Sequence, residues 1–547
     1  MDTPVYLRLT QRANEATTAA DWPTAAKLWA ELTQVNPTRG DFWYRLGEAH
    51  YKADEPLSAL TAYDAARERG VHDLGKYLFQ TKAELSLDIA RCFARLGDRG
   101  AALDEIEAAI EQGLPNRSDL DDEVFDGLRG LPRFVHCALP EAPSDRDSGW
   151  RTDLALLVAE IHRRSPVAHR FTEPINSAAA ELDRRIPELT DLQVVVELRR
   201  ILTLLGDGHA WVSIDNDRKE WKRELPIRLF QFGESVHITA ASREHADLVG
   251  CELLSIDGRP VRSVLDAVES ATPRDNRQQL LNEAPADLRH LPILHALGIA
   301  DRPDQARLQV SDDTGTRLVT VHVVDPPERA WGQRLRMPDW DWLPDRAPNP
   351  SAYLARVGER YWFEHDAENS LIHFGFNTLV ETPDAPLAEF YEKLFAQFDE
   401  VNPHRLVIDL RWNGGGNTFK AMALLSHILA RPELNRPDRL FIVIGRHTFS
   451  AAQNTVTMLG LHTRATFVGE PTGSSPNFTG ERIDFQLPYS KLTANVSDLY
   501  WQTSTPLDER TWIAPDLYTP PQLSDWTSGH DPALAAIHTY PIDSCGA

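Results

Sequence analysis

Apolar residues in the C-terminal half of the chain fall into short continuous runs separated by longer amphipathic segments. The runs at 370–376, 406–408 and 440–444 are almost wholly apolar, which is typical of strands buried on both faces. Apolar residues recur at helical spacing in the segments between and after them, at 386–400, 418–432 and 450–463. This alternation predicts an α/β core with parallel strands over residues 350–530.

The first 137 residues have a different pattern, in which small and apolar residues recur at helical spacing. The segments WYRLGEAHYKADEPLSALTAYDAARERG (43–70) and IARCFARLGDRGAALDEIEAAIEQGL (89–114) resemble tetratricopeptide repeats. The resemblance implies stacked helix pairs with a concave face that can bind a protein partner. The alternative is a plain helical cap on the rest of the chain.

Two further regions separate this helical domain from the α/β core. Residues 143–215 are predicted as helices that end in GDGHAWVSI (206–214), where His209 falls on a tight helix-to-strand turn. Residues 216–328 alternate like strands, with turns at 256–258 and 313–315. We interpret 326–351 as a linker and 531–547 as a C-terminal tail. The predicted fold class is therefore a multidomain α+β protein.

Composition narrows the functional classes. The 547-residue chain has a formal net charge of −24, which disfavours contact with nucleic acid or with an anionic membrane surface. Its four cysteines, Cys92, Cys137, Cys251 and Cys545, form no CxxC pair, so neither a disulfide framework nor a zinc site is expected. No signal peptide or apolar spanning segment is visible, and the expected location is cytoplasmic.

Candidate chemistry lies at the ends of two predicted core strands. The sequence LVIDLRWNGGGN (406–417) leads from a strand through Asp409 and Arg411 into three glycines, Gly414, Gly415 and Gly416. The sequence LFIVIGRHTFSAA (440–452) leads from the next strand to Ser450 at the start of a helix. A serine at a helix N-terminus beside a glycine turn can form a nucleophile with backbone N–H donors for an oxyanion.

These two motifs resemble the signatures of a clan of serine peptidases. The clan includes the tail-specific (C-terminal-processing) proteases, the tricorn core proteases and the interphotoreceptor retinoid-binding protein repeats, and the resemblance covers roughly residues 145–530. It implies Ser450 as the nucleophile and a PDZ-like domain at 216–328, with a β-rich spacer as the alternative. It also implies an oxyanion hole from the N–H of Ala451 and one from Gly415 or its neighbours Gly414 and Gly416. Asp409 and Arg411 are expected to hold the glycine turn.

The base that activates Ser450 is also inferred from the resemblance. In the tail-specific branch it is a lysine, but Ser475 occupies that position here, and Lys491 is the next candidate. The tricorn branch uses a histidine in a DGHxxL-like segment, which His209 matches, and a glutamate that corresponds to Glu509. Asp508 is adjacent and could orient the histidine instead. The predicted catalytic residues are therefore His209, Ser450 and Glu509.

The sequence thus predicts a serine peptidase of the tricorn or C-terminal-processing type that hydrolyses peptides or proteins without a cofactor or metal. A catalytically silent binding or scaffold protein on the same fold is the second hypothesis, because the retinoid-binding branch carries a hydrophobic ligand. An esterase or self-processing enzyme with the same residues is a third.

Overall fold

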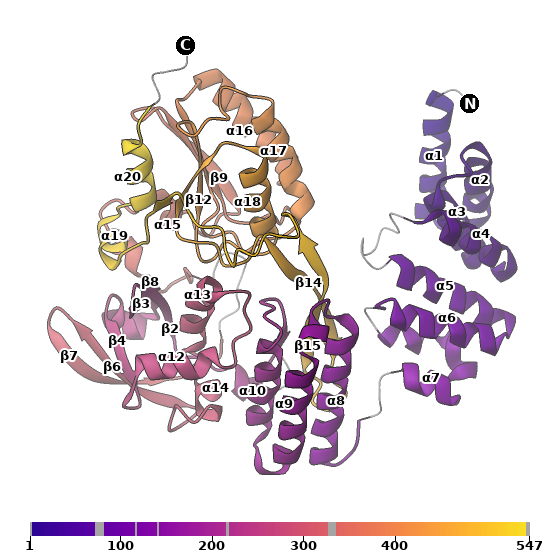
Figure 1. The fold of residues 1–547 in the computed structure, drawn as a ribbon, viewed down its shortest axis with the longest axis horizontal. Coiled ribbons are helices and arrows are strands. Elements are labelled where there is room, and N and C mark those ends of the chain that lie inside the picture. Colours follow the sequence, from indigo (N-terminus) through magenta and orange to yellow (C-terminus); the bar gives the residue numbers. More distant parts are fainter. Residues whose placement is uncertain are drawn as a thin grey trace. The chain divides into compact units, whose positions relative to one another are not determined.

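The computed structural model describes residues 3–71, 81–114, 117–138, 142–214, 218–326 and 335–542. The chain divides into two compact units, Met1–Arg164 with Ile483–Lys491, and Ser165–Arg482 with Leu492–Ala547. The structure is mixed α+β with a helical N-terminal region, which confirms the predicted fold class (Figure 1). None of the helices in the described residues has the length and apolar character needed to cross a bilayer. Cys92, Cys137 and Cys251 are free thiols, and Cys545 lies outside the described residues.

The first unit is built from consecutive helices that contact one another along the chain. Small residues bring these helices close: a Cβ on Gly47 would lie 2.5 Å from the ring of Tyr63. The helices are α1 (Thr3–Thr18), α2 (Trp22–Val35), α3 (Gly40–Lys52), α4 (Pro56–Arg69), α5 (Thr81–Leu96), α6 (Arg99–Glu111), α7 (Pro132–Cys137) and α8 (Arg146–Arg164). The similarity to tetratricopeptide repeats stays a prediction.

Helix α8 belongs to the first unit, although the sequence pattern grouped it with the segment that carries His209. Arg164 near its C-terminus donates to the carbonyl of Leu114 at 2.9 Å, and Glu160 pairs with Arg117 at 3.0 Å. These buried contacts attach α8 to the helices before it. The compact unit therefore extends beyond the predicted boundary at residue 137.

The α/β core of the second unit contains a six-stranded sheet in the order β16-β13-β12-β11-β10-β9. Strands β10 to β13 and β16 are parallel, and β9 is antiparallel to β10. The strands are β9 (Tyr361–Asp366), β10 (Leu371–Phe376), β11 (Arg405–Asp409), β12 (Leu440–Ile444), β13 (Thr466–Gly469) and β16 (Leu517–Tyr518). The three apolar runs recognised in the sequence are β10, β11 and β12, and all three are buried throughout.

Helices cover both faces of this sheet, which explains why its central strands are apolar at every position. Helices α16 (Leu387–Val401), α17 (Ala421–Leu429) and α18 (Ala451–His462) pack on one face. On the other face, α20 (Pro532–Thr539) buries Ala533 and Ile537 against the strands (Figure 1). The segment predicted as a C-terminal tail therefore begins with a helix of the core, and its last residues, 543–547, lie outside the described residues.

An inserted module lies between the His209 segment and the α/β core in sequence. Its sheet has the order β2-β3-β4-β6-β7, with β5 on β4 and β8 on β3. The strands are β2 (Ile227–Phe232), β3 (Ser235–Ala241), β4 (Glu252–Ile256), β5 (Arg259–Pro260), β6 (Gln305–Asp312), β7 (Gly315–His322) and β8 (Asp341–Trp342). Strand β8 lies within the predicted linker, where Trp342 and Leu343 are buried in the module core. PDZ-like folding stays a prediction.

The module also contains four helices that the strand-like pattern did not indicate: α11 (Lys219–Lys222), α12 (Val261–Glu269), α13 (Arg277–Asp287) and α14 (Leu291–Ala296). Ahead of the module, α9 (Thr172–Arg185) and α10 (Asp191–Thr203) lead to the short strand β1 (Trp211–Val212). This strand pairs with β15 (Thr493–Gln502), the neighbour of β14 (Asn477–Gln486). The turn between α10 and β1 carries His209.

Candidate active site

Ser450 lies on the connection between β12 and α18, immediately before the first residue of the helix. Its backbone has φ 56° and ψ −126°, a conformation that a residue with a side chain rarely adopts. Such a residue stores about 1–3 kcal/mol of strain, and strain of this kind concentrates at functional sites. Thr448 holds the turn, since its hydroxyl donates to the carbonyl of Leu410 and accepts from the N–H of Gly445. The serine hydroxyl is thereby presented at the carboxyl edge of the sheet.

The glycine turn after β11 lies directly beside Ser450. The side chain of Asn413 holds the turn by donating to the carbonyl of Phe376 at 2.8 Å and accepting from the N–H of Gly415 at 2.9 Å. Gly415 has φ +109°, and a Cβ there would lie 2.8 Å from the Cβ of Ser450 and 3.0 Å from the N of Ala451. Only glycine allows the two connections to approach this closely.

The backbone donors of this turn are not equivalent. The N–H of Gly415 is engaged by Asn413, whereas no hydrogen bond from the N–H of Gly414, Gly416 or Ala451 is formed within the described part of the chain. Ala451 is the first residue of α18, and the N–H groups in the first turn of a helix have no partner within it. An anion beside Ser450 would therefore meet Ala451 and a glycine other than Gly415.

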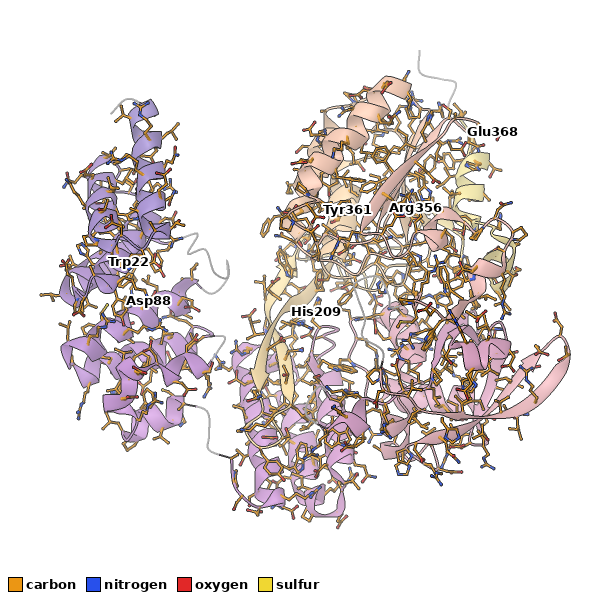
Figure 2. All side chains as sticks on the ribbon, turned by 180° about the vertical axis from the view of Figure 1, so that it is seen from behind. Trp22, Asp88, His209, Arg356, Tyr361 and Glu368 are labelled. Atoms are coloured by element: carbon orange, nitrogen blue, oxygen red, sulfur yellow. The ribbon has the colours of Figure 1, made fainter. Side chains whose placement is uncertain are left out.

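His209 faces Ser450 from the turn that follows α10. Its Nε2 lies 3.0 Å from Ser450 Oγ, within hydrogen-bond distance. The imidazole is stacked on Phe478, at 5.9 Å between ring centroids, and packs at a tilt of 30° against Phe449, at 4.4 Å. Burial and the positive charge of Arg482 lower the pKa of His209 to about 4. The imidazole is therefore neutral at pH 7 and can accept the serine proton. Figure 2 shows this histidine beneath the α/β core.

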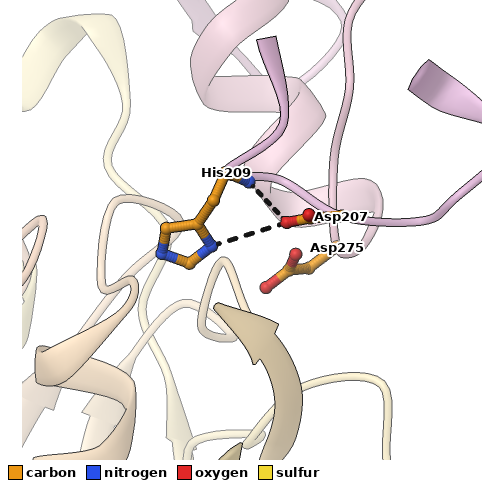
Figure 3. Close-up of side chains that lie close together, drawn as sticks. All are labelled: Asp207, His209 and Asp275. Atoms are coloured by element: carbon orange, nitrogen blue, oxygen red, sulfur yellow. Dashed lines mark hydrogen bonds and ion pairs between the residues drawn. The ribbon is translucent and has the colours of Figure 1, made fainter. Parts of the chain in front are cut away.

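Two carboxyl groups lie on the other side of the imidazole (Figure 3). Asp207 Oδ1 is 3.7 Å from His209 Nδ1 and accepts the backbone N–H of His209 at 2.9 Å. Burial raises the pKa of Asp207 to about 6, and burial with the nearby charge of Asp207 raises the pKa of Asp275 to about 7. His209 Nδ1 is buried and forms no hydrogen bond of normal geometry among the described residues, although the backbone of Thr479 lies close enough to raise the pKa of the imidazole. Asp207 is thus the acidic group that faces this nitrogen.

Asp207, His209 and Asp275 could also bind a metal ion, because their potential ligand atoms all lie within 4.8 Å of one another. They are the cluster of this kind found among the described residues. Each carboxylate, however, already accepts hydrogen bonds that hold the histidine turn: Asp207 from His209, and Asp275 from Gly208 at 2.7 Å. We assign no metal to this group.

The predicted acidic partner Glu509 lies elsewhere. Its side chain is exposed, and no hydrogen bond or ion pair joins it to His209 or to any other described residue. Asp508 accepts from the hydroxyl of Ser504 at 2.6 Å and pairs with Arg510 at 2.7 Å, and these contacts lower the pKa of Asp508. The structure therefore brings Ser450, His209 and the glycine turn together, and it leaves Glu509 and Asp508 apart from the imidazole.

Asp409 and Arg411 form a buried network at the entrance to the glycine turn. Arg411 bridges Asp409 and Asp531, both at 2.8 Å, and its guanidinium lies 3.8 Å from the ring centre of Tyr353. The guanidinium charge lowers the pKa of Asp409 to about 2, so this carboxylate stays ionised despite its burial. The network holds the end of β11, and the expected role of these two residues in holding the glycine turn stays a prediction.

Two cavities meet at the site. The larger, about 660 Å³, is lined by all three glycines of the turn and by apolar side chains that include Leu229, Phe230, Val380 and Trp412. The smaller, about 440 Å³, contains His209, Phe449, Trp211, Glu283 and Arg482. Asn282, Gly414 and His447 line both cavities, and Asn282 Nδ2 lies 3.0 Å from His447 Nδ1. Of the three residues that line both cavities, the sequence analysis identified only Gly414.

Known structures share this fold, although sequence comparison detects no relative. No protein-family model and no curated protein matches the chain. Mature CPAF matches with a TM-score of 0.52 and 15% identity, over 72% of this chain and 96% of its own. The complex of mature CPAF with lactacystin matches with a TM-score of 0.51 and 15% identity, over 72% and 98%. The photosystem II D1 C-terminal processing protease overlaps less, with a TM-score of 0.35 and 11% identity over 70% and 99%.

The class that these comparisons define is a fold class, that of a mixed α+β protein. Within that class, the chain has the fold of mature CPAF. The fold expected from the two sequence motifs is thereby confirmed.

Proposed function

We propose that this chain is a serine peptidase of the tricorn or C-terminal-processing type, with Ser450 as the nucleophile and His209 as the general base. The observation that carries the proposal is the 3.0 Å separation of His209 Nε2 from Ser450 Oγ beside the glycine turn. A serine hydroxyl becomes a competent nucleophile when a neutral imidazole at this distance removes its proton. The fold shared with mature CPAF supports the proposal.

The chemistry follows from the positions of these groups. Ser450 Oγ attacks a peptide carbonyl while its proton passes to His209 Nε2. The carbonyl oxygen becomes an oxyanion that accepts hydrogen bonds from the N–H of Ala451 and of a glycine in the turn. The imidazolium then protonates the leaving amine, and an acyl ester remains on Ser450. Water activated by the same imidazole hydrolyses the ester and regenerates the serine.

The two cavities suggest how a peptide lies across the site. Because the imidazole protonates the leaving amine, the cavity that contains His209 suits the leaving-group side of the substrate. The larger cavity then receives the acyl side, and its apolar lining, which includes Leu229, Val380 and Trp412, favours bulky apolar residues there. Peptides with such a residue before the scissile bond are the appropriate assay substrates. Binding of a protein partner by helices α1–α6 remains part of the proposal, which rests on the resemblance of their sequences to tetratricopeptide repeats.

A fluorophosphonate probe tests the proposal, because it reacts only with an activated serine. We expect covalent labelling of Ser450, measured by peptide mass spectrometry, and no labelling of the heat-denatured protein. The labelling rate should fall as the pH drops, first through about 6, where Asp207 loses its charge, and again through about 4, where His209 takes up a proton. Absence of both labelling and peptide hydrolysis would instead favour a binding or scaffold protein on this fold.

The acidic partner of His209 is tested by two isosteric substitutions. Asp207 faces Nδ1 at 3.7 Å, and a charge at that distance stabilises an imidazolium by up to about 4 kcal/mol at an effective dielectric constant of 20. We expect Asp207→Asn to lower kcat/KM by between about 10- and 10³-fold. Glu509→Gln changes an exposed side chain and should leave kcat/KM within about twofold of wild type. A large loss in Glu509→Gln alone would return the role to Glu509, through a rearrangement of its loop on substrate binding.

A further inference from the structure

The turn that carries His209 is held by residues of the inserted module. Gly208 has no room for a side chain, because a Cβ there would lie 2.2 Å from Gln279 Oε1. Gln279 Nε2 donates to the carbonyl of Gly208 at 3.3 Å, and Oε1 accepts the N–H of Asp275 at 2.7 Å. The backbone next to the histidine is therefore packed directly on the first turn of α13.

Asp275 connects the same turn to the α/β core. One carboxylate oxygen accepts the N–H of Gly208 at 2.7 Å, and the other accepts the hydroxyl of Ser474. Ser474 follows β13 and is fully buried. The Asp275 side chain thus connects Gly208, the residue before His209, to the Ser474 loop of the α/β core. Ser450 belongs to the same core.

Asn276 completes the connection. Its side-chain amide donates to the carbonyl of Thr472 at 3.1 Å and to that of Thr511 at 2.7 Å, while its oxygen accepts the N–H of Gln279 and caps α13. Two core loops are therefore tied to the N-terminus of this one helix. We name Asp275, Asn276 and Gln279 the clamp.

We propose that the clamp positions His209 against Ser450, so that hydrolysis requires the inserted module to be docked on the α/β core. The clamp forms no hydrogen bond to either catalytic side chain, and its hydrogen bonds to the histidine turn are made to the backbone of Gly208. A displacement of about 1 Å in a catalytic group can cost about 10²-fold in rate. The expected effect of the clamp on hydrolysis rests on the proposed function, whereas its expected effect on the position of the His209 turn does not.

Buried charge gives the clamp a pH dependence. Asp275 faces the carboxyl of Asp207, the imidazole of His209 and the hydroxyl of Ser474, and Arg482 adds a positive charge beside the imidazole. Burial raises the pKa of Asp275 from 3.8 to about 7, so the folded protein holds this proton more tightly than the unfolded chain does. The proton on Asp275 therefore stabilises the folded protein. This stabilisation is complete below about pH 4 and is lost as the pH rises through about 7.

Three variants test the clamp. Asp275→Ala removes both bridges, and we expect kcat to fall by about 10²-fold with little change in KM. Asp275→Asn can still accept from Gly208 and donate to Ser474, and it should recover most of the lost kcat. Its melting temperature should also exceed that of the wild type at pH 8 but not at pH 4. The matched control is Asp257→Ala, since Asp257 accepts the N–H groups of Asp301 and Arg307 in the same module, away from the site.

Hydrogen exchange of the 206–212 segment, followed by mass spectrometry, gives a readout that needs no activity. We expect faster exchange there in Asp275→Ala and wild-type exchange in Asp257→Ala. Wild-type kcat and wild-type exchange in Asp275→Ala would overturn the clamp. An equal loss of kcat in Asp257→Ala would overturn it as well, because general destabilisation of the module would then explain the effect. Faster exchange in Asp275→Ala, in a protein whose Ser450 is never labelled, would support the clamp and refute the peptidase.

Discussion

The Ser450→Ala variant is expected to lose between about 10⁴- and 10⁶-fold in kcat while it unfolds at the wild-type temperature. The substitution removes only the hydroxyl that lies 3.0 Å from His209 Nε2, and alanine meets the same backbone cost as serine at φ 56°. Steady-state hydrolysis of a fluorogenic peptide and a thermal melt measure the two quantities. Fluorophosphonate labelling should disappear in the same variant.

Ser426→Ala is the matched control, because the hydroxyl of Ser426 makes one hydrogen bond, to the carbonyl of Met422 on the exposed side of helix α17. This variant should keep wild-type activity and labelling. Retention of hydrolysis in Ser450→Ala would show that another group is the nucleophile. A loss of activity that accompanies a lower melting temperature in both variants would point to instability instead of chemistry.

The core strands could be predicted because their physical signal is local. Each of β10, β11 and β12 is buried on both faces, so each appears in the sequence as a continuous apolar run that ends where the chain turns. The glycines and Ser450 follow two of these strands directly. Their meeting at one edge of the sheet is then a consequence of parallel strand order.

The helices of the inserted module carry a weaker signal. Helix α13 contains Pro285, a residue that disfavours a helix interior, and α14 is only six residues long. The predicted tail gave no signal because α20 buries only Ala533 and Ile537 completely. Short elements of this kind are stabilised by tertiary packing, which a local pattern does not report.

The surroundings of His209 show the same limit. Asp207 lies two residues before the histidine and could have been considered from the sequence. Asp275 lies much further along the chain, in the inserted module between α12 and α13, so no local pattern connects it to His209. The one local clue was Gly208, whose missing side chain makes room for Gln279. Glu509 was inferred from a motif in a loop. A sequence motif specifies the position in space of a loop residue less well than that of a residue in a helix or strand. The acidic partner of the histidine is therefore decided by the paired substitutions at Asp207 and Glu509.

The Gly415→Ala variant is expected to lose between about 10²- and 10³-fold in kcat, the cost of one disabled oxyanion donor. The added Cβ would lie 2.8 Å from the Cβ of Ser450 and 3.0 Å from the N of Ala451, so it pushes against both the nucleophile and a predicted donor. Substrate binding in the larger cavity should change less, because the side chains of Val380 and Trp412 are untouched. Steady-state kinetics should therefore show the loss in kcat more than in KM.

Backbone strain must be separated from this steric effect, since Gly415 has φ +109° and alanine there costs about 1–2 kcal/mol in any surroundings. Gly258→Ala supplies the comparison: Gly258 has φ +77°, and a Cβ added there would meet nothing within 4 Å. Both variants should melt at a lower temperature than the wild type, but only Gly415→Ala should lose kcat. Equal activity in the two variants would mean that no oxyanion forms beside Gly415, and the glycine turn would then be a feature of the fold alone.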